Sequence, residues 1–216
     1  GKKEIKVADF LGNKLNKTTT KLKAHLGDVG KNGYRHFMRK EIDEQLPVCA
    51  KFLQENFNLA DLSIKNLENL VDHSIFHGIN RIHIVACGSA FYAGLVGKVT
   101  LEDFAKIPVA VELASEFRYR NPYLDSQTLI VAISQSGETA DTLASVTFAK
   151  KHNLKVLSIC NVEHSSLVRV SDAFYLMNSG PEIGVASTKA FTSMLMSLFY
   201  ISLNLSEQRK TLLKKD

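Results

Sequence analysis

The chain has 216 residues, of which 45% are hydrophobic and 23% charged, a balance that excludes disorder by composition and permits one large domain. No apolar run approaches the length of a membrane span, and no signal peptide opens the sequence. Three widely spaced cysteines, Cys49, Cys87 and Cys160, exclude a CxxC metal site. They indicate reduced thiols and a cytoplasmic protein.

The formal net charge of +5 belongs to the N-terminal part of the chain. Residues 1–40 hold eleven Lys and Arg against three Asp and Glu, whereas residues 41–216 hold sixteen against nineteen. Nucleic-acid-binding domains carry basic residues interleaved with aromatic ones on a folded face, and residues 41–216 lack this pattern. We therefore expect neither a nucleic acid nor a membrane as a partner.

The first elements expected along the chain are an arm and a broken helix. Residues 1–33 mix Lys, Thr, Asn and Gly with little sustained periodicity, which is typical of an exposed linker or arm. From Tyr34 to Leu53, apolar residues recur at helical spacing. Pro47 should kink or break this helix, because its ring clashes with the preceding turn.

A second helix is expected over residues 63–77, with Gly78 at its end. His73 and His77 lie four positions apart on it, but no third ligand lies nearby, so we expect no metal site. The expected organisation is thus an arm (1–33) and one domain (34–216), made of a helical lead-in (34–78) and an α/β core (79–206).

In the core, five short apolar runs alternate with helical patterns. The expected strands are residues 82–86, 109–111, 128–133, 156–160 and 173–177, and the expected helices include 140–151 and 187–205. Strands that alternate with helices form right-handed crossovers and a parallel sheet covered on both faces. The predicted fold class is therefore α/β, a three-layer αβα sandwich with a five-stranded parallel sheet preceded by helices.

The segment 134–139 joins a buried strand to the N-terminus of a helix. A turn of small residues in this position offers free N–H groups and the positive end of the helix dipole to an anion. Ser134, Gln135, Ser136 and Thr139 line it with three hydroxyls and an amide, and no Lys or Arg is among them. This composition suits a phosphate monoester and sugar hydroxyls, although an N-cap cluster with a turn glycine fits the same residues equally well.

Two other turns have the same composition. Ligands on parallel sheets bind at the carboxyl ends of the strands, near the point where the strand order reverses. This rule brings together the turns after the first, third and fifth expected strands, at residues 88–89, 134–139 and 180–187, all of which are rich in Gly, Ser and Thr. We predict that they form one pocket.

Three motifs resemble a known enzyme family. Residues 112–120 (ELASEFRYR), 134–143 (SQSGETADTL) and 181–190 (PEIGVASTKA) resemble glucosamine–fructose-6-phosphate aminotransferases (isomerising), more narrowly the first of their two sugar-isomerase (SIS) domains. Residues 37–45 (FMRKEIDEQ) resemble the segment that leads into that domain from the glutaminase half. The resemblance covers residues 34–205. It implies a flavodoxin-like SIS fold.

The resemblance also implies a function. The family comprises cytoplasmic dimers that convert fructose 6-phosphate and glutamine into glucosamine 6-phosphate and glutamate for amino-sugar synthesis, without a metal or nucleotide cofactor. Its catalytic groups lie in the glutaminase half, the second SIS domain and the C-terminal tail. We therefore expect no catalytic residue in this chain, which should bind fructose 6-phosphate or glucosamine 6-phosphate without turning it over. The expected partners are those two other domains and a second copy of the chain.

The residues that the resemblance implies contact the substrate are Gly88, Ser89, Ser134, Gln135, Ser136, Thr139, Val185 and Ser187. Ser89 stands where the family has a threonine that contacts the sugar. Ala90 departs from the Cys-Gly-Thr-Ser sequence common in the family, because it lacks the hydroxyl that usually reaches the phosphate. Loss of one such hydrogen bond weakens binding by about 1.5–3 kcal/mol, so we expect weaker binding rather than an inactive site.

For the other potentially reactive residues, the sequence favours structural roles over catalytic ones. Cys87 has no base or cation beside it in the sequence, which favours packing over nucleophilic catalysis. Glu138 lies in a first helical turn and favours a role as a dipole partner. Lys189 also lies in a first turn, which favours a surface or ion-pair role. We expect three charged residues after the second strand to form subunit contacts: Glu116, Arg118 and Arg120.

Two alternative functions remain open at this point. A free-standing phosphosugar isomerase needs its own acid–base pair, but His83 lies in a strand and His152 and His164 lie in loops away from the strand ends. A non-enzymatic phosphosugar sensor, such as the effector domain of a transcriptional regulator, needs an upstream helix-turn-helix, and residues 1–33 do not have its pattern.

Overall fold

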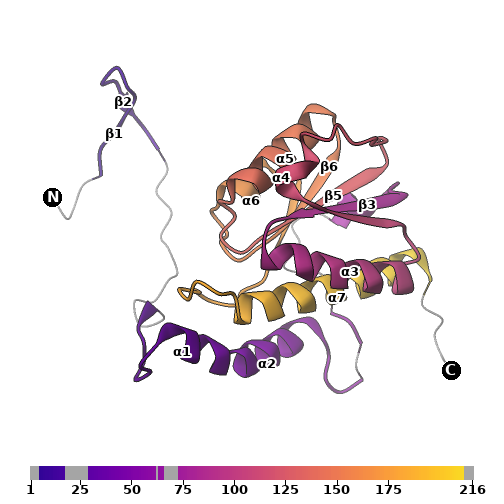
Figure 1. The fold of residues 1–216 in the computed structure, drawn as a ribbon, viewed down its shortest axis with the longest axis horizontal. Helices are drawn as coiled ribbons and strands as arrows, with labels where there is room; N and C mark the ends of the chain where they lie inside the picture. Colours follow the sequence, from indigo (N-terminus) through magenta and orange to yellow (C-terminus); the bar gives the residue numbers. More distant parts are fainter. Residues whose placement is uncertain (1–4, 18–28, 62, 66–72, 212–216) are drawn as a thin grey trace. The chain divides into compact units, whose positions relative to one another are not determined.

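The computed structural model describes residues 5–17, 29–61, 63–65 and 73–211 (Figure 1). Contacts between Cα atoms divide the chain into two units, Gly1–Gly30 and Lys31–Asp216. Within the described ranges, no helix has the length and apolar character needed to cross a lipid bilayer.

The first unit contains a small antiparallel hairpin of strands β1 (Val7–Ala8) and β2 (Lys14–Leu15). The carboxylate of Asp9 organises the turn between them, because it accepts the backbone N–H groups of Leu11 and Asn13 at 2.9 and 2.8 Å. The residues of both strands are exposed. This stretch lies within the segment for which we expected an exposed arm.

The second unit is organised around a five-stranded parallel sheet. Its strands are β3 (Arg81–Ala86), β4 (Val109–Leu113), β5 (Thr128–Ser134), β6 (Lys155–Cys160) and β7 (Ala173–Leu176). They lie in the order β4-β3-β5-β6-β7, and every neighbouring pair is parallel. The chain reverses its direction of travel across the sheet between β3 and β5, which makes this pair the topological switch point of a flavodoxin-like sheet.

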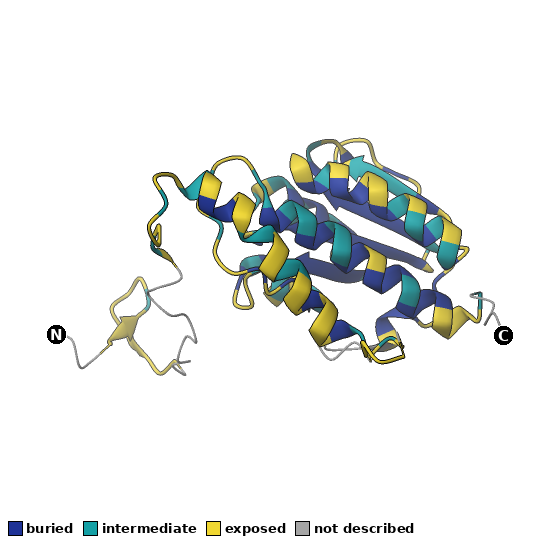
Figure 2. Ribbon diagram, turned by 90° about the horizontal axis from the view of Figure 1, so that it is seen from below, coloured by how far each residue is buried: buried dark blue, intermediate teal, exposed yellow. Residues whose placement is uncertain are grey.

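Helices cover both faces of the sheet (Figure 1). The strands behind the helices of one face are mostly buried (Figure 2). The helices are α3 (Ser89–Phe104) and α7 (Lys189–Arg209) on one face, and α4 (Ala114–Phe117), α5 (Ala140–Lys151) and α6 (Ser166–Val170) on the other. The predicted three-layer αβα sandwich with a five-stranded parallel sheet is confirmed.

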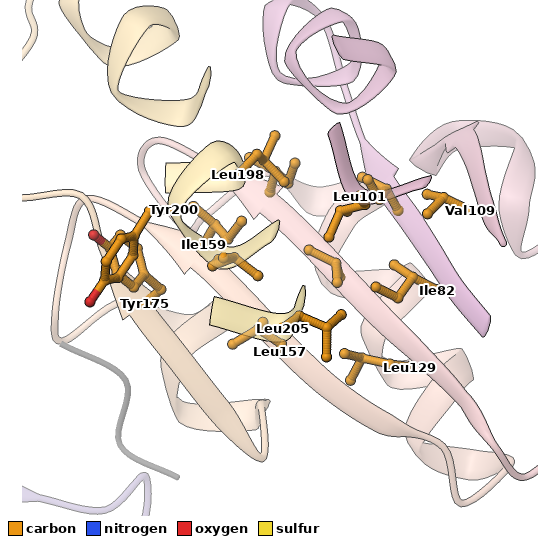
Figure 3. Packing of buried hydrophobic residues seen from close by; sticks show 14 of the residues in the cluster. Ile82, Leu101, Val109, Leu129, Leu157, Ile159, Tyr175, Leu198, Tyr200 and Leu205 are labelled. Atoms are coloured by element: carbon orange, nitrogen blue, oxygen red, sulfur yellow. The ribbon is translucent and has the colours of Figure 1, made fainter. Parts of the chain in front are cut away.

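The two hydrophobic clusters follow from the pleat of the strands, since successive side chains point to opposite faces. In β5, Leu129, Val131 and Ile133 join the cluster beneath α3 and α7, whereas Ile130 and Ala132 join the cluster beneath α4 and α5. Figure 3 shows the first of these clusters, with side chains from the strands interleaved with those of α3 and α7. Because both faces are covered, β5 is buried along its whole length.

The helix expected from Tyr34 to Leu53 is broken, as predicted from Pro47. The structure has α1 (Phe37–Asp43) and α2 (Gln45–Asn56), separated at Glu44. Pro47 has no N–H to donate to the carbonyl of Asp43, and its ring would clash with that carbonyl in a continuous helix. The break therefore falls one turn before the proline.

Helix α2 packs against α7 and adds an outer layer to this side of the domain (Figure 1). Phe52 meets the ring of Tyr200 edge-on, with centroids 6.0 Å apart, and Phe57 does the same at 5.7 Å. The hydroxyl of Tyr175, in β7, donates to the side-chain carbonyl of Asn56 at 3.2 Å. The lead-in is thus part of the same hydrophobic body as the sheet.

The prediction of one helix over residues 63–77 is wrong at both ends of that range. Residues 63–65 are not helical, because the carboxylate of Asp61 accepts the backbone N–H of Ser63 at 2.9 Å and so stabilises a local turn in place of a helix. Residues 66–72 lie outside the described residues. The last part forms a short 3-10 helix, η2 (His73–Phe76).

Candidate functional site

A cavity of about 220 Å³ lies at the carboxyl ends of β3 and β5, at the switch point of the sheet. Three segments far apart in the sequence form its walls: the turn after β3, the turn after β5, and the loop between β7 and α7. The lining residues are Cys87, Ser89, Ala90, Ile133, Ser134, Gln135, Ser136, Thr139, Glu182, Gly184, Val185, Ser187 and Met194. The three turns expected to meet in one pocket do meet there.

Seven of the eight residues expected to contact substrate line this cavity. The eighth, Gly88, lies between Cys87 and Ser89, which both do. Its φ of 58° and ψ of −134° let the chain pass from β3 into α3, a conformation that glycine adopts without the steric cost of a Cβ. The structure therefore brings the whole predicted set to one edge of the sheet, while ligand contact itself stays a prediction.

The turn at 134–139 is organised by its own hydroxyls. Ser134 Oγ lies 2.9 Å from Thr139 Oγ1 and accepts the N–H of Gly137 at 3.1 Å. Ser136 Oγ accepts the N–H of Glu138 at 3.2 Å. Because Ser136 is the acceptor in that bond, its own proton remains to be donated to a ligand.

Position 137 requires glycine, because its backbone conformation and its close neighbours leave no room for a side chain. Its φ is +66°, and a Cβ there would lie 2.2 Å from Ser165 Oγ and 2.7 Å from Cys160 Sγ. Its carbonyl accepts the N–H of Leu167 at 3.0 Å, which ties the turn to α6. The turn is therefore packed closely onto β6 and α6.

The electrostatics of this turn come from the backbone. Helix α5 begins directly after Thr139, so its first N–H groups and the positive end of its dipole face the turn. Within the part of the chain that the structure describes, no Lys or Arg lines the cavity. An anion here would be held by N–H and hydroxyl donors.

Glu138 partners a different helix from the one we expected. Its Oε1 accepts the N–H of Ser166 at 2.7 Å, at the start of α6 rather than of α5. This N–H lowers the pKa of the Glu138 carboxyl, and the side chain lies outside the cavity lining. Its carboxylate is thus directed at the start of α6, and it is not among the residues that line the cavity.

Glu182 is a carboxylate in the cavity lining that the sequence alone did not single out. Its Oε1 accepts the N–H groups of Thr188 and Ala190 at 2.9 and 3.1 Å, so it caps the N-terminus of α7. Its Oε2 accepts the hydroxyl of Ser187 at 3.1 Å. The sequence signal that could have pointed to Glu182 is an acidic residue shortly before the start of a helix, and this signal is weak.

The bond to Glu182 decides what Ser187 offers a ligand. Because Ser187 donates its proton to the carboxylate, only its lone pairs remain, and these accept hydrogen bonds from hydroxyl groups. A phosphate dianion has no proton to give and is repelled by Glu182. The cavity lining therefore includes hydrogen-bond donors at 134–139 and an acceptor at Ser187.

Asn161 holds the start of the loop between β7 and α7. Its side-chain oxygen accepts the N–H and the hydroxyl of Ser179 at 2.9 and 3.0 Å, and its amide nitrogen donates to the carbonyl of Gly180 at 2.6 Å. The backbone N–H of Asn161 donates to the carbonyl of Gln135 at 3.1 Å. One residue thus joins this loop to the turn after β5.

Helix α1 holds the middle of the same loop. The carboxylate of Glu41, 2% exposed, accepts the N–H of Ile183 at 2.6 Å and the N–H of Gly184 at 3.0 and 3.1 Å. Lys189, at the start of α7, pairs with Glu44 at 2.6 Å. The ion-pair role expected for Lys189 is observed, but a surface position is wrong, since the residue is 3% exposed.

The family model described as "SIS domain" matches residues 75–201, which is more than half of the chain. The chain belongs to the SIS domain family. Its sheet order and the position of its cavity agree with that assignment. Helices α1 and α2 both lie entirely before the matched range.

This SIS domain is similar to parts of longer enzymes. It is 42% identical over 213 residues to glutamine–fructose-6-phosphate aminotransferase (isomerizing) of Clostridium tetani, covering 98% of this chain and 35% of that protein. It is 43% identical over 208 residues to the enzyme of the same name in Mycobacterium leprae, covering 95% and 33%. The chain thus spans about a third of the length of the curated relatives it matches.

The chain is also similar to parts of longer chains in solved structures. The C-terminal domain of glucosamine-fructose-6-phosphate aminotransferase from Francisella tularensis matches with a TM-score of 0.79 and 41% identity, covering 86% of this chain and 52% of that one. Glucosamine-6-phosphate deaminase from Thermotoga maritima matches with a TM-score of 0.66 and 26% identity, covering 80% and 49%.

The charged residues expected at a subunit contact lie away from the cavity of the SIS domain. Arg120 holds the carboxylate of Glu112 with two hydrogen bonds, at 2.7 and 2.6 Å. Arg118 donates to the hydroxyl of Tyr119 at 2.6 Å and packs over its ring. These contacts are internal to the chain, and the subunit contact stays a prediction.

His83 is held in β3 and does not line the cavity. Its Nε2 lies 3.1 Å from Glu112, and its ring packs edge-on against Phe117. Burial lowers the pKa of His83, with the nearby Glu112 carboxylate opposing that shift. Its buried position within the strand agrees with the sequence-based view that His83 is not an acid–base catalyst.

Proposed function

We propose that this SIS domain binds fructose 6-phosphate and its product, glucosamine 6-phosphate, as part of a glutamine–fructose-6-phosphate aminotransferase (isomerising) that supplies amino sugars. The observation that carries the proposal is the convergence of three polar segments, far apart in the chain, on one cavity lined by both donors and acceptors. The similarity of 42% over 98% of the chain to enzymes of that name supports it.

In this proposal the phosphate lies in the turn at 134–139. Its oxygens accept hydrogen bonds from the first N–H groups of α5 and from the hydroxyls of Ser136 and Thr139. The sugar extends toward Ser187, whose lone pairs accept from its hydroxyls, with Val185 and Ser89 on either side. The domain binds and orients the substrate.

The proposal assigns no proton transfer to this chain. Among the described residues, those that line the cavity include no His or Lys, and the carboxylate of Glu182 already accepts hydrogen bonds from three neighbouring residues. A group engaged in this way is poorly placed to take a proton from a substrate. Amino transfer and isomerisation are then the work of other parts of the parent enzyme.

The proposal also retains the domain organisation and the dimer expected from the sequence. Residues 1–33 are the arm that follows a glutaminase domain, and residues 34–216 are the SIS domain, which pairs with a second SIS domain. The assembly is a cytoplasmic homodimer in which Arg118 and its neighbours contact a second copy. Light scattering of an Arg118→Ala variant tests the dimer, and an unchanged mass argues against that contact.

Calorimetric titration of the 216-residue chain with fructose 6-phosphate, glucose 6-phosphate and UDP-N-acetylglucosamine tests the binding proposal. We expect fructose 6-phosphate to bind most tightly, and Ser136→Ala to weaken it by about tenfold or more through loss of one charge-assisted bond. Ser115→Ala, a half-buried serine outside the cavity lining, is the control. No preference for fructose 6-phosphate over the other two ligands would count against the proposal.

A further inference from the structure

One wall of the cavity depends on a residue that lies outside both the cavity and the matched family range. Glu41 stands on α1, and its carboxylate accepts N–H groups from Ile183 and Gly184. Gly184 lines the cavity, as does the next residue, Val185. The contact spans more than 140 positions of sequence.

We propose that Glu41 is a positioning residue for the sugar-facing wall of the cavity. By fixing the backbone at Ile183 and Gly184, its carboxylate sets where Val185 and Ser187 stand over the strand ends. This inference rests on the proposed function, since the wall has a role in recognition when the cavity takes a sugar phosphate.

The backbone geometry makes the wall dependent on this carboxylate. Gly184 approaches so closely that a Cβ there would lie 2.5 Å from Glu41 Oε2. Two successive N–H groups point at the same carboxylate, and without it both would need new partners. The side chain of Val185 is fully exposed, so packing does not fix its position.

Glu41 is itself held in place. Its neighbours on the lead-in contact α7, where Glu44 pairs with Lys189 at 2.6 Å and Gln45 accepts the hydroxyl of Thr192 at 2.7 Å. Helix α1, the loop and the start of α7 therefore form one polar unit.

The turn at 134–139 is stabilised without any contact from Glu41. Its hydrogen bonds run within the turn, to β6 and α6, and to the backbone N–H of Asn161. Loss of Glu41 should therefore affect recognition of the sugar and leave recognition of the phosphate almost unchanged.

The test compares Glu41→Ala and Glu41→Gln with the wild-type 216-residue chain. Dissociation constants for fructose 6-phosphate and for inorganic phosphate are measured by calorimetry, with competition where phosphate binds weakly. We expect Glu41→Ala to weaken fructose 6-phosphate about tenfold and inorganic phosphate less than about twofold. Glu41→Gln should fall between, because its amide oxygen replaces one carboxylate oxygen while its NH₂ group opposes the N–H of Gly184.

Glu55→Gln is the matched control. Glu55 lies on α2 and pairs with Lys51 at 3.6 Å on the exposed face, so the same substitution there removes a charge without touching the loop. Amide hydrogen exchange without ligand gives a second measure. We expect faster exchange at residues 181–187 in both Glu41 variants, and unchanged exchange at 134–139.

The outcomes separate the inference from the proposed function. Equal weakening of both ligands, or unchanged exchange at 181–187, would show that Glu41 does not position this wall. If the wild-type chain does not bind fructose 6-phosphate, the proposed function fails, and the exchange data still decide whether Glu41 holds the loop. If Glu41→Ala does not fold, Glu41→Gln carries the same comparison.

Discussion

The turn at 134–139 and the loop between β7 and α7 face the same cavity but are held by different kinds of contact. The turn is held by bonds within itself, such as that between Ser134 and Thr139, and by the start of α6, where Ser166 lies 28 positions from Glu138. The loop is held by Asn161 from the neighbouring strand end and by Glu41, which lies 142 positions from Ile183. The contacts of the turn thus come from within it and from β6 and α6, whereas the loop also depends on α1.

The difference extends to chemistry. The turn presents N–H and hydroxyl donors, which any phosphate monoester satisfies. The loop presents the lone pairs of Ser187, which require a hydroxyl at a particular place. Under the proposed function, we expect affinity for the class of ligand to reside in the turn and selection within the class to reside in the loop. The following substitutions test this division.

Gly137→Ala should have the largest effect, because it disrupts the turn directly. The left-handed backbone and the overlap with Ser165 and Cys160 together should lower the free energy of unfolding by about 2–5 kcal/mol. Urea denaturation measures the change. Gly78→Ala is the control, since Gly78 has a φ of +75° and a Cβ there would meet no atom within 4 Å, and this change should cost about 1–2 kcal/mol. Equal losses for the two variants would show that the turn is not tightly packed.

Asn161→Ala should have the next largest effect, because it removes three hydrogen bonds at the base of the loop. We expect a loss of about 1–3 kcal/mol in the free energy of unfolding. Fructose 6-phosphate should also lose more affinity than inorganic phosphate. Asn58→Ala, which removes one exposed hydrogen bond to Ala60, serves as control. Identical affinity losses for both ligands would contradict the division between turn and loop.

Ala90→Ser should strengthen binding. Ala90 lines the cavity near the start of α3, and a hydroxyl there would restore the donor that the resemblance leads us to expect. One added charge-assisted hydrogen bond should tighten phosphate and fructose 6-phosphate alike by about tenfold, measured by calorimetry. The exposed Ala60→Ser is the control. A gain for the sugar phosphate alone would place the hydroxyl on the sugar instead.

Glu138→Gln should have the smallest effect, because the side chain is exposed and solvent screens its charge. The hydrogen bond from Ser166 lowers the pKa of Glu138 below its ordinary value of 4.5. The stabilisation is therefore present above that pH and is lost as the pH falls through the lower, folded-state value. Melting temperatures should differ slightly at pH 7 and converge as the pH is lowered below 4.5. A constant difference at every pH, or an equal change in Glu163→Gln on the loop before α6, would argue against this contact.

The sequence predicts the turn because the strand, the small residues and the helix that form it are consecutive in the chain. The run Thr128–Ser134 is apolar and β-branched, the small residues follow, and the helical pattern over residues 140–151 matches α5 to the residue. The same local logic predicts the break before Pro47. It fails at residues 63–65, where a side-chain bond from Asp61 stabilises a turn that periodicity does not reveal.

The contacts that hold the loop between β7 and α7 could not be predicted from the local sequence. Glu41 stands in a helical pattern with charged neighbours and reads as a solvated residue, yet it is buried against Gly184. Nothing within a window of a few residues indicates a partner so distant. The Gly-Ser-Thr composition of 180–187 predicted that this segment reaches the cavity. The carboxylates that hold it, Glu41 and Glu182, required the assembled structure.

The separation between Glu41 and Gly184 has a consequence for how the protein is made. Residues 134–139 can adopt their conformation once β6 and α6 have been synthesised. The bond to Glu41 closes a loop of more than 140 residues and must wait until nearly the whole domain has left the ribosome. Under the proposed function, a nascent chain therefore completes the turn proposed to hold the phosphate before the loop proposed to select the sugar.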